Sequence, residues 1–133
     1  HGCEQVGIEE LLFQSNVVSI HVDGRKDNKH LCDINVFRQM KKDALFINTA
    51  RGFVVDAYAL TDYLTHSPDA RAVLDVHDPE PISQEYPLLH LPNVTLYPHI
   101  ACKTNTASIN MGWVVKDIHA VLCGKNPLFE VKA

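Results

Sequence analysis

The chain has 133 residues, 46% of them hydrophobic and 21% charged, which is typical of one compact globular domain and too short for two. Its formal net charge is −4 and its twelve lysines and arginines are scattered, so we expect no nucleic-acid partner and no binding to an anionic membrane. No apolar run approaches the ~20 residues of a membrane-spanning helix.

The cysteines and histidines show no metal-ligand spacing. The four cysteines lie far apart and include no C-x-x-C pair, which argues against a zinc site and against a disulfide framework. Free thiols indicate a reducing compartment, so we expect a cytoplasmic protein. The eight histidines include no H-x-x-x-H pair, and we predict no metal. Because residue 1 is His and no signal-peptide pattern follows, we expect a piece of a longer protein.

Helix and strand patterns alternate along the chain, which is typical of right-handed βαβ units around a parallel sheet. Apolar runs predict four strands, at residues 17–22, 44–47, 70–76 and 94–97. Apolar residues at helical spacing predict four helices: one around residues 8–12, one capped by Asp33, one capped by Asp56, and one long helix from Thr104 or Asn105 to Gly124. Phe46, Tyr97 and Trp113 are expected in the core.

No repeat or linker separates these elements, so we expect residues 1–133 to form a single unit. The sequence contains no G-x-G-x-x-G turn, which in a dinucleotide-binding parallel domain joins the first strand to a helix N-terminus. Two interpretations stay open. Either this fold does not bind a dinucleotide, or the first half of the domain lies outside the chain.

Ligands of open parallel sheets bind at the carboxyl ends of the strands, so the informative residues are those that follow each predicted strand. They are His21 and Val22, then Thr49, Ala50 and Arg51, then Asp75 with Glu80 downstream, and then His99. Successive strands would thus bring a guanidinium, two carboxylates and an imidazole to one edge of the sheet.

These residue types suit acid–base chemistry on an anionic substrate. The planar guanidinium of Arg51 matches the two oxygens of a carboxylate, and Gly52 beside it allows a close approach of the backbone. A carboxylate beside His99 would orient its ring and favour its protonated form. Glu80 fills this role if its loop folds over the end of the last strand.

Each of these residues also has an ordinary structural interpretation. Arg51 could form a surface salt bridge with Asp56. His99 could be a structural histidine with satisfied hydrogen bonds, and Glu80 a solvated surface residue. Asp75 differs, because an acid in an otherwise apolar strand needs a partner. The remaining internal histidines are assigned to the surface or to positions behind the site: His30, His66, His77, His90 and His119.

Three ordered motifs resemble those of one family. INTARGFVVDAYAL (residues 47–60) resembles the signature INxARGxxVDExAL of D-isomer-specific 2-hydroxyacid dehydrogenases, LDVHDPEP (74–81) resembles LDVFxxEP, and LPNVTLYPHIA (91–101) resembles NVxxTPHIA. SNVVSIHV and FRQMKKDALFIN also match in place and order, so the resemblance covers nearly the whole chain. LLFQSNVVSIHV, DVHDPEP and SINM are similar to the C-terminal binding protein corepressors, a branch of the same family.

The resemblance implies an α/β fold, the second half of a Rossmann-type, doubly wound NAD-binding domain with about four parallel strands. It implies that Arg51 binds the substrate carboxylate, that His99 is the general acid/base, and that Glu80 pairs with His99. The residues implied to line the NAD site are His21, Val22, Thr49, Ala50, Arg51, Asp75 and His99. Asp75 would contact the nicotinamide. The implied reaction is reversible hydride transfer between NAD and a small D-2-hydroxy acid or its 2-oxo acid, in a homodimeric full-length protein.

The sequence departs from the family pattern at three positions, with Asp23 for a usual Pro, Ala57 for Glu and His77 for Phe. The family's Gly-rich turn, acidic ribose-binding residue and substrate domain have no counterpart in these 133 residues. By itself the chain is therefore expected neither to bind NAD tightly nor to turn over. Two functions stay open for the longer protein: a dehydrogenase, or an NAD-binding corepressor of the same family.

Overall fold

The computed structural model describes residues 2–128. The chain divides after His99 into two compact units, His1–His99 and Ile100–Ala133, and each is described by itself. Among residues 2–128, no helix combines the length and the apolar character that crossing a membrane requires. That residues 1–133 form one part of a single cofactor-binding domain stays a prediction.

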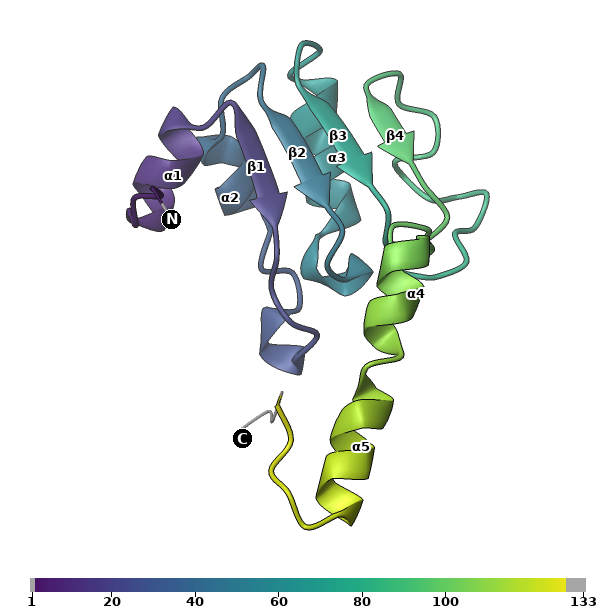
Figure 1. Cartoon of the computed structure of the whole chain (residues 1–133). Coiled ribbons are helices and arrows are strands. Elements are labelled where there is room, and N and C mark those ends of the chain that lie inside the picture. The colour runs from purple at the N-terminus through teal and green to yellow at the C-terminus, as the bar shows by residue number, and fades with distance from the viewer. Residues whose placement is uncertain (1, 129–133) are drawn as a thin grey trace. The chain divides into compact units, whose positions relative to one another are not determined.

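The first unit is built on one parallel sheet of four strands, β1 (Val17–Ile20), β2 (Leu45–Asn48), β3 (Arg71–Leu74) and β4 (Val94–Leu96). The strands lie side by side in chain order (Figure 1). All four predicted strands are present, and three of them are shorter than predicted, because only the residues that pair with a neighbour belong to the ladder. The predicted α/β class with a parallel sheet is confirmed.

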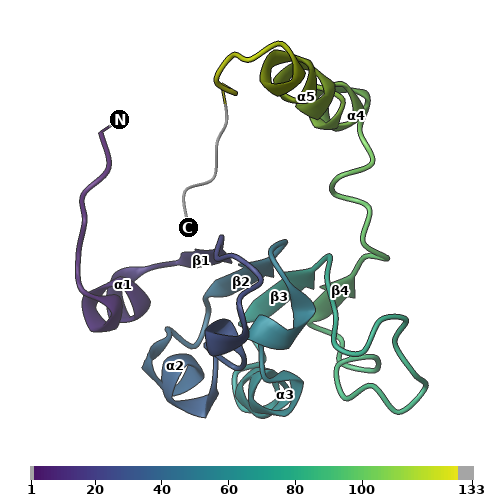
Figure 2. The same ribbon diagram turned by 90° about the horizontal axis from the view of Figure 1, so that it is seen from below.

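Short helices connect the strands of this unit: α1 (Ile8–Gln14), η1 (Lys26–Asn28), α2 (Ile34–Gln39), η2 (Gly52–Val54) and α3 (Ala57–Thr65). Both predicted aspartate caps are confirmed. The Asp33 carboxylate accepts hydrogen bonds from the first-turn amides of α2, and the Asp56 carboxylate accepts from those of α3. Figure 2 shows α2 and α3 on the same face of the sheet.

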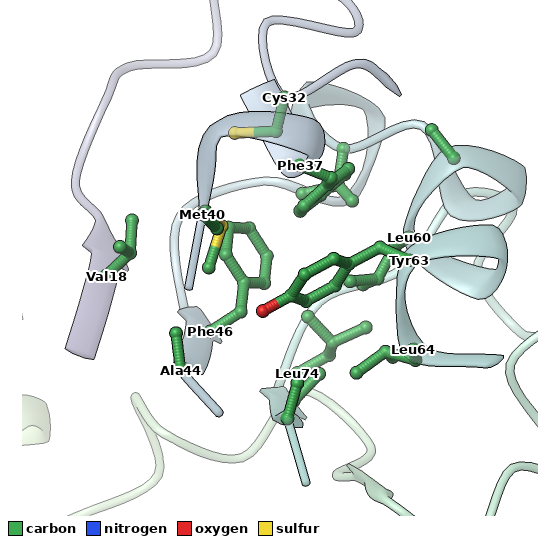
Figure 3. Packing of buried hydrophobic residues seen from close by; sticks show 14 of the residues in the cluster. Val18, Cys32, Phe37, Met40, Ala44, Phe46, Leu60, Tyr63, Leu64 and Leu74 are labelled. Carbon is green, nitrogen blue, oxygen red and sulfur yellow. The ribbon is translucent and has the colours of Figure 1, made fainter. Parts of the chain in front are cut away.

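The core lies between this face of the sheet and the two helices (Figure 3). Phe37 of α2 is fully buried, with its ring centroid 5.2 Å from that of Phe46 in β2 and 5.7 Å from that of Tyr63 in α3. Alternate residues of a strand point to opposite faces, which is why Phe46 is buried while its neighbours are only half-buried. The prediction of Phe46 in the core is confirmed.

The four strands end together. Ile20, Asn48, Leu74 and Leu96, the last residues of β1 to β4, pair with one another in register and form one row across the sheet. Residues that follow a strand therefore begin from the same edge, and the number of residues after the strand sets how far each one reaches beyond it. This row positions the site described below.

The second unit contains two helices where the sequence predicted one long helix, α4 (Asn105–Met111) and α5 (Val114–Leu122). The expected ends are confirmed, because Thr104 caps α4 and Gly124 takes a positive φ of 71° after α5. The break falls at Gly112 and Trp113, where the amide of Val115 bonds to the carbonyl of Gly112, three residues back. A glycine weakens a helix by about 1 kcal/mol relative to alanine, which favours a break there.

Two aromatic residues expected in the core are not buried. Tyr97 directly follows β4 and is 45% exposed, and Trp113 between α4 and α5 is also 45% exposed. Both predictions relied on residue type alone, and aromatic side chains are often only partly buried.

Candidate active site

An imidazole and a carboxylate meet at the edge where the strands end. His99, three residues after the end of β4, places its ring Nδ1 3.0 Å from Oε2 of Glu80, in the loop that follows β3. A carboxylate can only accept, so Nδ1 carries the hydrogen when Glu80 is ionised. This leaves Nε2 as the ring nitrogen that can exchange a proton with a ligand.

Glu80 is held from two sides. Its Oε1 accepts a hydrogen bond of 2.8 Å from the backbone amide of His77, while its Oε2 accepts from His99. Partial burial by itself raises the pKa of the Glu80 carboxyl, but the hydrogen bonds from His99 and from the His77 amide outweigh it, and the pKa lies below its usual value. Glu80 is therefore an anion near neutral pH, which is the state that supports a proton-carrying histidine.

The backbone of His99 adopts an uncommon conformation. Its φ is 55°, in the left-handed region, which costs roughly 1–2 kcal/mol for a residue with a Cβ. Such a conformation persists only where surrounding contacts fix it, and the bond to Glu80 is one such contact. The side chain stays 45% exposed, so it is accessible to a ligand.

A pocket of about 310 Å³ opens beside this pair, at the lower end of the range for small-molecule sites. Its polar groups are the ones just described, and the rest of its wall is largely apolar. The lining residues are His77, Glu80, Pro81, Ile82, Leu96, Tyr97, Pro98 and His99. An apolar wall beside an exchangeable proton suits a small organic acid better than a highly charged ligand.

Arg51 lies on the same edge but not in this pocket. Its guanidinium Nη1 donates a hydrogen bond of 2.7 Å to the carbonyl of Ala50, and its side chain lies beside Gly24. The alternative of a salt bridge to Asp56 is wrong, since that carboxylate caps α3 and Arg51 forms no ion pair within residues 2–128. The structure therefore brings Glu80 and His99 together, whereas Arg51 is exposed on the loop after β2 and does not line their pocket.

The buried Asn48 shapes the loop that carries Arg51. The Asn48 side chain is fully buried, accepts from the amide of Ala50 and donates to the carbonyl of Arg51, both at 3.0 Å. Its backbone carbonyl accepts from the amide of Asp75, which ties this loop to the end of β3. Asn48 follows the sheet pattern of a core residue, so only its position at a strand end could have indicated this role.

The other predicted residues also lie at this edge. His21 is exposed with Nε2 2.8 Å from the Ser19 hydroxyl, and Val22 is half-buried against the core. Thr49 is exposed and Ala50 half-buried. Asp75 comes directly after β3 and is only 5% exposed. Residues 2–128 contain no cluster of three potential metal ligands.

His77 lies behind the Glu80–His99 pair, which is one of the two positions that the sequence left open for it. It is 9% exposed, so the surface alternative is wrong, and it also lines the pocket. Its Nε2 lies 2.8 Å from the carbonyl oxygen of Tyr97, and its ring meets that of Tyr86 edge to face. The available signal was that His stands where the resembling family has Phe, a residue type that is normally buried.

Comparison with known proteins gives the family of the chain. The family described as "D-isomer specific 2-hydroxyacid dehydrogenase, NAD binding domain" matches residues 1–101. A glyoxylate reductase of Thermofilum pendens is 42% identical over 125 residues, which are 93% of this chain and 37% of the relative. The chain thus spans less than half the length of this relative.

Solved structures agree with this assignment. The structure of a D-lactate dehydrogenase from Treponema pallidum matches with a TM-score of 0.79 and 33% identity, over 96% of this chain and 43% of that one. A D-lactate dehydrogenase with NAD⁺ from Lactobacillus jensenii matches with a TM-score of 0.79 and 27% identity, over 96% and 43% of the two chains. The predicted Rossmann-type fold is confirmed, and the chain belongs to the NAD-binding domain family of D-isomer-specific 2-hydroxyacid dehydrogenases.

Proposed function

We propose that this chain supplies the acid–base residues of an NAD(H)-dependent 2-hydroxyacid dehydrogenase that interconverts a small 2-oxo acid and its D-2-hydroxy acid. The observation that carries the proposal is the 3.0 Å contact between His99 Nδ1 and Glu80 Oε2, with Glu80 also bound by the His77 amide. A histidine held in this way can exchange one proton at Nε2 and keep its orientation. The corepressor alternative stays a prediction.

In this proposal His99 performs the proton transfer. In the reduction direction, protonated His99 donates the proton from Nε2 to the oxygen of the substrate carbonyl, and Glu80 stabilises the imidazolium before the transfer. In the oxidation direction, neutral His99 accepts the hydroxyl proton at the same nitrogen. Arg51 binds the substrate carboxylate, since an exposed guanidinium offers two parallel donors to its two oxygens.

The residues at this edge fit a nicotinamide cofactor in the chemistry of their donors and acceptors. Asp75 is a carboxylate that is only 5% exposed at the end of β3, and it is the type of acceptor that a carboxamide NH₂ group needs. In the proposed site His21, Val22, Thr49 and Ala50 would line the cofactor cleft together with Asp75. NAD(H), when bound, supplies or accepts the hydride.

Kinetics of a chimeric enzyme would test the proposal. Residues 1–133 replace the matching segment of the Thermofilum pendens glyoxylate reductase, and NADH oxidation is followed with glyoxylate and pyruvate. We expect turnover, and we expect His99→Ala to lower kcat by about 10²–10⁴-fold, the usual contribution of a general acid, while the Kd of NADH stays within a few-fold. His90→Ala, an exposed histidine away from the strand end, is the matched control.

Arg51→Lys tests the substrate-binding role in the same chimera. An ammonium cannot reproduce the two parallel donors, so we expect a large loss of kcat/KM for 2-oxo acids. Arg71→Lys is the control, because Arg71 is exposed at the opposite end of a strand. A His99→Ala variant with the turnover of its parent would refute the acid–base role, and an Arg51→Lys variant with unchanged kcat/KM would refute the carboxylate-binding role.

A further inference from the structure

His77 connects the separate pieces of chain that carry the site. Its amide donates to Oε1 of Glu80, at 2.8 Å, and its ring Nε2 lies 2.8 Å from the carbonyl oxygen of Tyr97, two residues before His99. His77 thus bonds both to Glu80 and to the chain segment that carries His99.

The backbone of His77 also packs against the Arg51 loop. A Cβ placed on Gly52 would lie 1.8 Å from the His77 carbonyl oxygen, so the two backbones are in direct contact. This contact leaves His77 little room to move on that side. The ring is confined on another side by Tyr86, at 5.6 Å between centroids and 79° between planes.

The hydrogen bonds of the His77 ring define its tautomer. A carbonyl oxygen can only accept, so Nε2 carries the hydrogen in the bond to Tyr97. The other ring nitrogen, Nδ1, is buried and has no hydrogen-bond partner within the described part of the chain. A phenylalanine at this position could fill the same space, but it could not donate to the Tyr97 carbonyl.

We propose that His77 is a positioning residue, whose side chain fixes the end of β4 relative to the Glu80 loop and thereby sets the geometry of the Glu80–His99 pair. The hydrogen bond to Tyr97 orients the segment that leads to His99, and the amide bond holds the Glu80 carboxylate on the other side of the pair. The catalytic meaning of this inference rests on the proposed function. The geometry itself does not, and it can be measured without turnover.

The test is an NMR titration of the 133-residue chain, free of cofactor and substrate, which reports the Glu80 side-chain carboxyl by its ¹³C shift. Two variants separate shape from hydrogen bonding: H77F keeps the ring and removes the donor, whereas H77Q keeps a donor near Nε2. In H77F we expect the titration midpoint of Glu80 to rise toward that of an ordinary glutamate, because the bond from His99 is loosened. In H77Q we expect the wild-type midpoint, and H90F serves as a control that leaves it unchanged.

A second measurement needs no variant. The ¹⁵N shifts of the His77 ring at pH 8 report which nitrogen carries the hydrogen, and we expect Nε2. A hydrogen on Nδ1 would overturn the proposal, as would a folded H77F with the wild-type Glu80 midpoint, or an H77Q whose midpoint moves as far as that of H77F. If H77F does not fold, the tautomer and the H77Q midpoint decide the question. Inactivity of the chimera with normal results here would count against the proposed function alone.

Discussion

Replacing Gly52 by alanine adds one methyl group at a place where two backbones touch. The new Cβ would lie 1.8 Å from the carbonyl oxygen, 2.0 Å from the carbonyl carbon and 2.6 Å from the Cα of His77. Ordinary contact begins at 3.4 Å, so the closest pair is about 1.6 Å too near. The atoms that must move belong to the main chain, and no side-chain rotation can relieve the overlap.

The expected cost follows from this geometry. Overpacking of a well-packed site usually costs about 1–3 kcal/mol, and a clash between backbones belongs at the upper end, at about 3 kcal/mol. For a unit of 60–100 residues, 1 kcal/mol corresponds to a change of roughly 4–8 °C in Tm, so we expect Gly52→Ala to lower Tm by roughly 12–24 °C. Thermal unfolding followed by far-UV circular dichroism measures this directly.

Gly24→Ala is the matched control. Its nearest new contact is the flexible side chain of Arg51, at 3.4 Å from Nε, which can move aside. We expect its stability to lie within about 0.5 kcal/mol of wild type. If Gly52→Ala and Gly24→Ala unfold at the same temperature, the close contact between Gly52 and His77 does not exist in solution.

Three further predictions concern the pH dependence of stability, the reactivity of the thiols and the contribution of a core residue to stability. The folded pKa of Glu80 lies below its unfolded value, so ionised Glu80 stabilises the fold above its usual pKa of 4.5. This contribution is lost as the pH falls through the folded pKa. Urea unfolding should therefore show a smaller loss of unfolding free energy below pH 4.5 in Glu80→Gln than in wild type. Burial, aided by the charge of Asp33, raises the pKa of the Cys32 thiol to about 11. At pH 8 iodoacetamide should therefore label the three exposed cysteines of the folded protein, and it should label Cys32 only after unfolding. Mass spectrometry detects the labelled residues. Phe37→Ala should cost about 3–5 kcal/mol in unfolding free energy, whereas Phe13→Ala, at a residue 74% exposed, should change it little; equal losses would contradict the described core.

The sequence predicted best what depends on local chemistry. The caps at Asp33, Asp56 and Thr104 and the stop at Gly124 were all predicted, because each involves a side chain or a φ angle within a few residues of its helix end. The parallel sheet was also predicted, because helix and strand patterns that alternate along the chain are typical of βαβ units.

Features that depend on distant contacts could not be predicted in the same way. The burial of His77 arises from Gly52, Tyr86 and Tyr97, which lie 9 to 25 residues away in the sequence. The break between α4 and α5 was missed because apolar spacing continues through it, and spacing reports which residues share a face rather than whether the backbone bonds are continuous.

The common ending of the four strands has a consequence for how the chain tolerates insertions. His99 comes three residues after the row that ends with Leu96, and each residue of extended chain adds about 3.3 Å. One extra residue between Leu96 and His99 would displace the imidazole by more than the length of its bond to Glu80. Added length in the loop at residues 83–91 would leave Glu80 and His99 in place, because that loop leads into the start of β4 and the row lies at its end. Natural length variation in relatives should therefore collect before β4 and be rare after it.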